Sequence, residues 1–231
     1  MEAPSRCSGH SRNVSSSYKL EKALDELPIF PLPRLVFFPN TMLPLHVFEP
    51  RYRKMLADCL ETHGAMAVVR LEPPNSREGR GGPEKISKVA GAGVVVHHEQ
   101  LPDGRSNLVL AGSARVSLEE LPFLPPYRRA RATLLECVRS RVPEKDQTAL
   151  VAAATDFVRE VRRHDSDFSF ELPQSRSAGI LADVCAAHLI VDADVRQRLL
   201  EELDDAVRVR AVIEELAVQR LSLGERSRIL H

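Results

Sequence analysis

Cys185 and His188 are the two side chains whose types and spacing come nearest to a reactive pair, because they stand three residues apart in a segment with helical periodicity. A thiol and an imidazole at that spacing can bind a metal ion or act as nucleophile and base. Both residues also fall on the apolar stripe of a helix that we predict at 178–189, which carries Leu181 and Leu189. Buried thiols and core histidines are common on such stripes, so we predict packing rather than chemistry here.

The other histidines and cysteines are weaker candidates for metal binding. Cys7 and His10 are spaced like half of a metal site, but no second pair accompanies them. His97 and His98 are neighbours in a predicted strand, where adjacent side chains point to opposite faces and cannot hold one ion together. His46 lies in another predicted strand, at a position where we expect exposure. We therefore predict no catalytic residue, no metal and no cofactor.

Sequence motifs of hydrolases and nucleotide-binding enzymes are missing. Neither GxSxG nor HExxH occurs. Gly79, Gly81 and Gly82 lie in a polar loop at 72–84, but this loop lacks the GxxxxGKS or GxxxxGKT spacing of a phosphate-binding loop, and no helix follows it directly. We therefore predict that the chain is not an enzyme. A hydrolase of unrecognised type, built on the thiol–imidazole pair, stays open as an alternative.

A group of cations near residue 130 raises the question of nucleic acid. Arg128, Arg129 and Arg131 lie beside Tyr127, and phosphate binding depends on cations that share one face. The neighbouring acidic residues are Glu119, Glu120 and Glu136. The whole chain carries 32 Lys and Arg against 32 Asp and Glu, so no net charge attracts nucleic acid. We prefer a solvated strand face, and RNA binding is the first alternative, ahead of the hydrolase.

Composition indicates an ordinary globular protein of 231 residues, with 43% hydrophobic and 28% charged residues. The four cysteines are spaced irregularly, which favours reduced thiols and a cytoplasmic protein. Residues 1–24 are polar and serine-rich, so we expect a disordered tail rather than a signal peptide. No apolar run approaches the roughly 18 residues of a membrane span, so we expect no membrane contact.

A proline-rich stretch near the N-terminus sets the predicted architecture. The runs 27–32 and 35–38 are short, apolar and punctuated by prolines, which strands tolerate at starts, edges and bulges. Residues 43–48 alternate in polarity, which predicts a further strand. A helix should then begin at Pro50 and end at Gly64, because proline suits the first helical position and glycine the residue after the last turn.

The rest of the chain predicts more strands and then helices. The expected strands lie at 65–71, 86–100, 106–111, 116–121 and 127–138, with a hairpin turn at Asp103-Gly104 and a bend or bulge at Gly91 and Gly93. Four helices should follow. The first begins at Pro143, the second spans 178–189, the third is capped by Asp192 or Asp194, and the fourth is capped by Asp204 or Asp205. The prediction is an α+β fold. A disordered tail (1–24) precedes a small β-barrel with one packed helix (25–139) and a unit of about four helices (140–231).

Two parts of this sequence resemble the N-terminal, substrate-binding domain of the Lon protease family. The first holds Pro28, Phe30-Pro31-Leu32, Phe38-Pro39, Leu43-Pro44-Leu45 and Phe48-Glu49-Pro50-Arg51-Tyr52. The second, ADVCAAHLIVDADVRQRLLEELDDAVRVRAVIEEL, resembles the four-helix subdomain of that domain. The resemblance covers about residues 27–221 and implies a PUA-like β-barrel followed by helices. It does not extend to the ATPase module or the serine–lysine protease domain of Lon, so neither activity is carried over.

The resemblance implies a stand-alone, non-catalytic module that recognises polypeptides. Such a module would bind protein substrates or partner proteins, a protease or an ATPase among them, through exposed apolar surface or a free strand edge. We predict Phe37, Phe38 and Met42 as protein-binding residues, because consecutive aromatics in a proline-bounded loop cannot both face one strand's core. The alternative is that both phenylalanines pack in the crease between barrel and helices. A PUA-like fold also keeps the RNA-binding alternative open.

Overall fold

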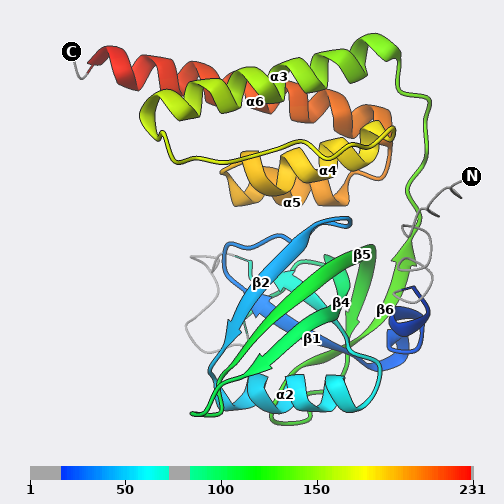
Figure 1. The fold of residues 1–231 in the computed structure, drawn as a ribbon. Coiled ribbons are helices and arrows are strands. Elements are labelled where there is room, and N and C mark those ends of the chain that lie inside the picture. The colour runs from blue at the N-terminus through cyan, green and yellow to red at the C-terminus, as the bar shows by residue number, and fades with distance from the viewer. Residues whose placement is uncertain (1–16, 73–83, 230–231) are drawn as a thin grey trace, which may run out of the picture.

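Six strands among the described residues, 17–72 and 84–229, form one sheet in this computed structural model (Figure 1). They are β1 (Leu27–Leu32), β2 (Met42–Val47), β3 (Ala65–Arg70), β4 (Val89–Gln100), β5 (Ser106–Glu120) and β6 (Arg129–Leu135). Their order is β2-β5-β4-β3-β1-β6, and β5 also pairs with β6. Five strands therefore close into a barrel, as predicted, and β2 lies outside the ring. β1 and β3 are parallel, and the other neighbours are antiparallel.

β5 closes the barrel because it is long enough to pair with two strands along one side. Residues 106–111 pair with β2, and residues 115–120 pair with β6. The predicted break between two separate strands is therefore wrong, since one continuous strand satisfies both partners. The predicted hairpin between β4 and β5 is confirmed, with Gly104 at a φ of 79°.

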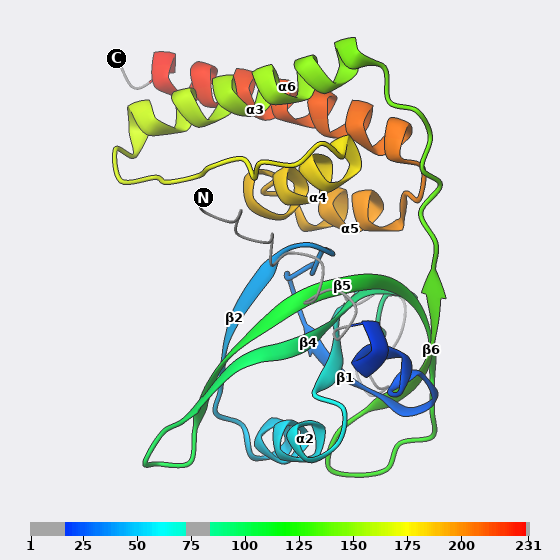
Figure 2. The ribbon, with the colours of Figure 1, turned by 45° about the vertical axis from the view of Figure 1, so that its right-hand side comes forward.

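α2 (Pro50–Glu61) packs across the end of the barrel that lies away from the other helices (Figure 2). Its buried residues are Tyr52, Met55, Leu56 and Cys59, which share a core cluster with Phe30, Phe37 and Met66. Gly64 follows at a φ of 67°, a left-handed conformation that strains residues with a side chain. The predicted helix and the left-handed glycine after it are confirmed.

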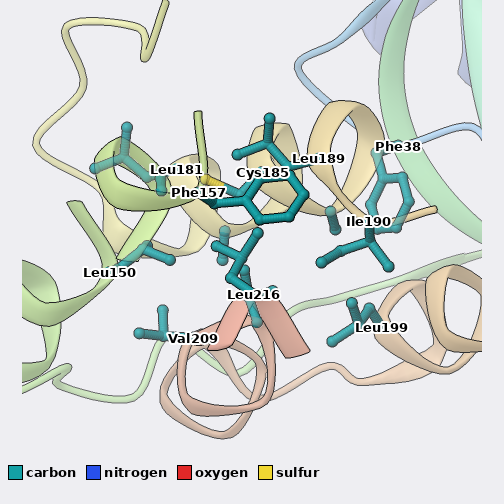
Figure 3. Close-up of a cluster of buried hydrophobic side chains, with 14 of the residues drawn as sticks. Phe38, Leu150, Phe157, Leu181, Cys185, Leu189, Ile190, Leu199, Val209 and Leu216 are labelled. Carbon is teal, nitrogen blue, oxygen red and sulfur yellow. The ribbon is translucent and has the colours of Figure 1, made fainter. Parts of the chain in front are cut away.

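Four further helices form a layer over the opposite side of the barrel: α3 (Glu144–His164), α4 (Ala178–Leu189), α5 (Ala193–Glu201) and α6 (Asp205–Ile229) (Figures 1 and 2). Their shared core includes Leu150, Phe157, Leu181, Cys185, Leu189, Leu199, Val209 and Leu216 (Figure 3). Asp192 caps α5 by accepting hydrogen bonds from the backbone N–H groups of Asp194 and Val195. Asp204 caps α6 in the same way. The predicted C-terminal helices are confirmed.

Residues 33–41, which we call the crossing segment, join β1 to β2 between the barrel and the helical layer. Leu35 and Phe37 pack into the barrel core, whereas Val36 and Phe38 pack into the helical core. Figure 3 shows the Phe38 ring among the side chains of the helices. The predicted strand at 35–38 is therefore wrong, because these residues alternate between two cores and form no strand.

Gly91 and Gly112 let the crossing segment lie directly on β4 and β5. A Cβ atom at Gly91 would lie 1.9 Å from the carbonyl oxygen of Phe37, and one at Gly112 would lie 2.1 Å from the carbonyl oxygen of Phe38. Neither distance leaves room for a side chain, so both positions require glycine. The bulge predicted near Gly91 is also present, as a register shift between Ala92 and Gly93.

The first described residues, from residue 17 onward, pack against the barrel. Residues 17–21 are helical, and Leu20 and Ala23 pack against the barrel in a cluster with Leu27 and Ile29. The end of the predicted tail is thus structured because its apolar side chains cover core residues. Residues 1–16, which hold Cys7 and His10, and residues 73–83 lie outside the described residues. No helix among the described residues has the length and hydropathy needed to cross a membrane.

Candidate functional site

A groove of about 620 Å³ opens on the barrel between the end of β1 and the edge strand β2. It exists because β1 pairs with β6 only at Leu27 and Pro28, since β6 begins at Arg129, the partner of Pro28. The remaining residues of β1 pair with β3 on one side and face β2 across the groove on the other. The loop between β5 and β6, with Phe123 and Pro126, forms a further wall.

Aromatic side chains dominate this groove. The chain has eight Phe, three Tyr and no Trp, and five of these rings line it: Phe30, Phe48, Tyr52, Phe123 and Tyr127. The Phe30 and Tyr52 rings are buried and in contact, with centroids 4.4 Å apart. Phe48 and Phe123 are 60% and 63% exposed, which is unusual for large apolar side chains. The groove thus offers an aromatic floor and an aromatic rim to solvent.

Prolines remove hydrogen-bond donors from the open edge of β1. The Ile29 N–H donates to the Arg128 carbonyl of the β6 side, whereas the Leu32 carbonyl accepts from Leu71 on the β3 side. Because backbone groups alternate along a strand, the backbone groups of Pro31 and Pro33 point to the same side as those of Ile29, which is the side of the groove. Neither has an N–H group, so this edge presents carbonyl oxygens without the matching donors.

The edge strand β2 is interrupted in the same manner. The Thr41 carbonyl accepts a hydrogen bond from the Gly112 N–H of β5, so the backbone of Thr41 faces β5. Backbone groups alternate along a strand, so those of Leu43 and of every second residue after it face β5 as well. Pro44 consequently has its backbone on the open side, where a missing N–H disturbs no pair within the sheet. Prolines at edge positions discourage the addition of another strand. The groove is therefore built for contacts with side chains more than for a continuous backbone ladder.

The charges around the groove are largely paired. Arg51 and Glu49 form an ion pair at 2.9 Å, and Arg128 donates from Nε and Nη2 to the two carboxylate oxygens of Glu120 at 2.5 and 2.6 Å. Burial, together with a hydrogen bond to Asp58, raises the pKa of Tyr127 to about 12, so its phenol stays neutral at physiological pH. The walls thus combine neutral rings with charges that mostly satisfy one another.

A second cavity, of about 1310 Å³, lies between the barrel and the helical layer. Its deepest charged side chains are Arg115, Asp183 and Arg208, each at most 3% exposed. Arg115 forms two hydrogen bonds to Asp183, and Arg208 is ion-paired with Asp183 and Asp205. These charges join β5 to α4 and α6, so their role is to hold the two units together.

The structure separates the three residues predicted to bind protein. Phe37 and Phe38 are 2% and 0% exposed, and Met42 is 59% exposed. The expected exposure of the two phenylalanines is wrong because they face two different cores from one extended segment, which is the crease packing considered as the alternative. Met42 remains accessible, but it does not line the groove. Its role in binding stays a prediction.

Sequence reasoning missed the residues that shape the groove, chiefly Phe48, Tyr52 and Phe123. The sequence places Phe48 in a strand and Tyr52 in a helix, but does not predict a binding role for either. Phe123 had a signal of its own, because it lies in the apolar, proline-rich segment Leu121–Pro126 (LPFLPP). Proline disfavours regular structure there, and a surface loop exposes its apolar side chains to solvent.

Cys185 is packed in the helical layer, but His188 is exposed and belongs to no core cluster, so the predicted packing of His188 is wrong. Cys185 is fully buried, and its burial raises the pKa of the thiol to about 12. Partial desolvation lowers the pKa of His188, whose ring centroid lies 6.0 Å from that of Phe170. A neutral thiol in a core is inert, so the predicted packing of Cys185 is confirmed. Among the described residues, no three His, Cys, Asp or Glu side chains converge as metal ligands would.

The remaining candidates are engaged by other polar groups. The three arginines near residue 130 each have an acidic partner: Glu120 for Arg128, Glu26 for Arg129 and Glu119 for Arg131. His46 Nδ1 lies 2.8 Å from Asn107 Oδ1, and His98 Nε2 lies 3.2 Å from Ser106 Oγ. This pairing leaves little free positive charge for phosphate on the strand face.

The sequence matches the family described as ATP-dependent protease La (LON) substrate-binding domain over residues 26–218. It is 26% identical to Lon protease of Roseiflexus castenholzii over 87% of this chain, and 29% identical to Lon protease of Anaeromyxobacter dehalogenans over 84%. The chain spans about a quarter of the length of these relatives, 25% and 23% respectively.

Two solved structures share the fold. A Lon N-terminal domain protein from Xanthomonas campestris has a TM-score of 0.60 and 18% identity over 82% of this chain and 97% of that one. The N-terminal domain of Mycobacterium avium complex Lon protease has a TM-score of 0.58 and 12% identity over 84% of this chain and 98% of that one. With the barrel, the helical layer and the match over residues 26–218, these findings show that the chain belongs to the Lon substrate-binding domain family.

Proposed function

We propose that this chain is a non-catalytic module that binds segments of polypeptide in the groove between β1 and β2. The observation that carries the proposal is the gathering of five aromatic rings at one solvent-open groove, with Phe48 and Phe123 exposed at its rim. Exposed aromatic surface of this kind is typical of binding sites for apolar groups of a partner. The family's description as a substrate-binding domain supports the same role.

The binding mode that fits the groove is insertion of side chains rather than addition of a strand. Pro31, Pro33 and Pro44 occupy the open edges, and an added strand would find no donor at these positions. Bulky apolar side chains, by contrast, would bury against Phe30 and Tyr52. We therefore expect the affinity for a polypeptide segment to depend mainly on its side chains and only weakly on hydrogen bonds to its backbone.

The partners we propose are unfolded or misfolded polypeptides and proteins that act on them, including a protease or an ATPase. The activity of the whole Lon relatives is not transferred, because the chain spans only about a quarter of their length. The groove's described lining contains no Ser, Thr, Cys or Lys, so its chemistry suits binding. The cytoplasmic location stays a prediction from the sequence.

A matched pair of variants tests the proposal. Phe123 and Leu124 are neighbours with 63% and 61% exposure, but only Phe123 lines the groove. Phe123→Ser should weaken binding of a fluorescently labelled, chemically unfolded polypeptide by about tenfold, since burying an exposed Phe side chain against a partner contributes roughly 1.5–3 kcal/mol and about 1.4 kcal/mol is a factor of ten in affinity. Leu124→Ser should leave it unchanged. Equal loss in both variants, or in neither, would contradict the proposal.

A further inference from the structure

The charged residues that line the groove do not cancel completely. Three carboxylates (Glu49, Glu84 and Glu120) face two guanidinium groups (Arg51 and Arg128). The Glu49–Arg51 and Glu120–Arg128 pairs account for four of these five charges. Among the described lining residues, one negative charge, that of Glu84, is therefore left in a groove whose other walls are mainly aromatic and apolar.

The backbone of Glu84 is held at the groove by Arg128. Arg128 Nη1 donates to the Glu84 carbonyl oxygen at 3.1 Å, so the same guanidinium that holds Glu120 also holds this backbone. All three arginine nitrogens are thereby used. The Glu84 side chain is exposed and forms no hydrogen bond or ion pair with any residue of the described chain. Its charge nevertheless acts on the groove. Burial is the main cause that raises the pKa of Tyr52, and the Glu84 carboxylate adds to it. The hydrogen bond to Glu120 is the main cause that raises the pKa of Arg128, and the Glu84 carboxylate adds to this as well.

A carboxylate beside several aromatic faces is a recognition site for an organic cation. Ring faces attract ammonium and guanidinium groups, and the carboxylate adds an ion pair. The alkyl stems of Lys and Arg would lie on the apolar walls while their charged ends reach the mouth. A carboxylate-bearing side chain at the same place would be repelled.

We propose that Glu84 determines specificity in the groove, selecting polypeptide segments in which Lys or Arg flanks bulky apolar residues. This inference rests on the proposed polypeptide-binding function and names the class of segment that the groove prefers. The aromatic walls supply affinity for the apolar residues, and Glu84 discriminates among the residues beside them.

Three short synthetic peptides test the inference. They share flanking Phe and Leu residues and differ at one central position, which is Lys, Gln or Glu. At low salt, fluorescence anisotropy should show the Lys peptide binding roughly two- to fivefold more tightly than the Gln peptide, as expected for a partly exposed ion pair, with the Glu peptide weakest. High salt should narrow these differences.

Variants of Glu84 locate the effect. Glu84→Gln should abolish the preference for Lys over Gln, and Glu84→Lys should reverse the order of the Lys and Glu peptides. Glu136→Gln, which neutralises an exposed glutamate at the second cavity, is the matched control and should retain the preference.

The outcomes separate this inference from the function on which it rests. If none of the peptides binds, the polypeptide-binding function itself fails. If all three bind equally, or if the Lys preference survives in Glu84→Gln, the selectivity assigned to Glu84 is overturned while polypeptide binding stands. A preference for Lys that disappears only in the Glu84 variants supports the inference.

Discussion

Arg115 of β5 reaches out of the barrel and binds Asp183 of α4 through two hydrogen bonds of 3.1 and 2.5 Å, with both side chains almost completely buried. The Nε of Arg115 also donates to the carbonyl oxygen of Leu200 at the end of α5, at 2.8 Å. Arg208 of α6 lies 2.9 Å from the same Asp183 carboxylate. A single carboxylate therefore compensates cations from both the barrel and the helical layer.

Removal of that carboxylate should destabilise the whole protein. Asp183→Ala removes the ion-pair partner of the buried Arg115 and one of the two partners of the buried Arg208, so we expect the free energy of unfolding to fall by about 3–5 kcal/mol. Urea denaturation followed by circular dichroism measures this change. The control is Arg131→Ala, which breaks an exposed pair of 3.6 Å with Glu119 and should change stability by less than about 1 kcal/mol. Comparable losses in the two variants would refute the structural role of Asp183.

Truncation of Phe38 should damage stability more than binding. Its ring is 0% exposed in the helical core, so Phe38→Ala should lower the free energy of unfolding by about 3–5 kcal/mol. Met42→Ala, at an exposed position in the same part of the chain, should have little effect on unfolding. At a temperature where Phe38→Ala remains folded, its affinity for an unfolded polypeptide should match that of the wild type. A specific loss of affinity with stability intact would restore Phe38 as a contact residue.

Glycine at position 112 should be required by the crossing segment. In Gly112→Ala the new Cβ would lie 2.1 Å from the Phe38 carbonyl oxygen, and backbone at that distance has to move. We expect a loss of about 1–3 kcal/mol or more in the free energy of unfolding, as in overpacked cores. Ser113→Ala, one residue along β5 and half-buried, is the control and should change stability by less than about 1 kcal/mol. A fully stable Gly112→Ala protein would show that the crossing segment does not pack on β5 as described.

Alkaline pH should destabilise the protein through its buried thiols. Burial raises the pKa values of Cys59 and Cys185 from 9.0 to about 12, so between these values the folded state keeps protons that the unfolded state releases. Stability must then fall as pH rises, by about 1.4 kcal/mol per pH unit for each thiol. Denaturation of wild type and Cys185→Ala between pH 9 and 11 isolates one of these contributions. The variant should show the shallower decline, and parallel curves would contradict the assignment.

The local elements of this fold were predictable because their signals are local. Asp192 and Asp204 mark helix starts through their own neighbouring N–H groups, and Gly64 ends α2 through its own φ. The crossing segment was not predictable in the same way. Whether Phe37 and Phe38 are exposed depends on a second core that is built by residues more than a hundred positions later.

The groove has the same non-local origin. Phe48 and Phe123 stand 75 positions apart in the sequence. They line one groove because β5 pairs with both β2 and β6. The role proposed for Glu84 could not be predicted either. The sequence has 32 acidic residues, and only the structure shows which of them lie in the groove and which are paired there. Sequence reasoning reached the class of function through resemblance, and the location of the site required the barrel.

Mapping of a bound polypeptide by NMR tests the central claim most directly. Titration of the isotopically labelled protein with an unfolded polypeptide should shift the amide signals of Phe48, Tyr52 and Phe123 and those of their neighbours around the groove. The signals of α6, on the far side of the helical layer, should stay in place (Figure 1). Shifts confined to the helical layer, with the groove unaffected, would contradict the account.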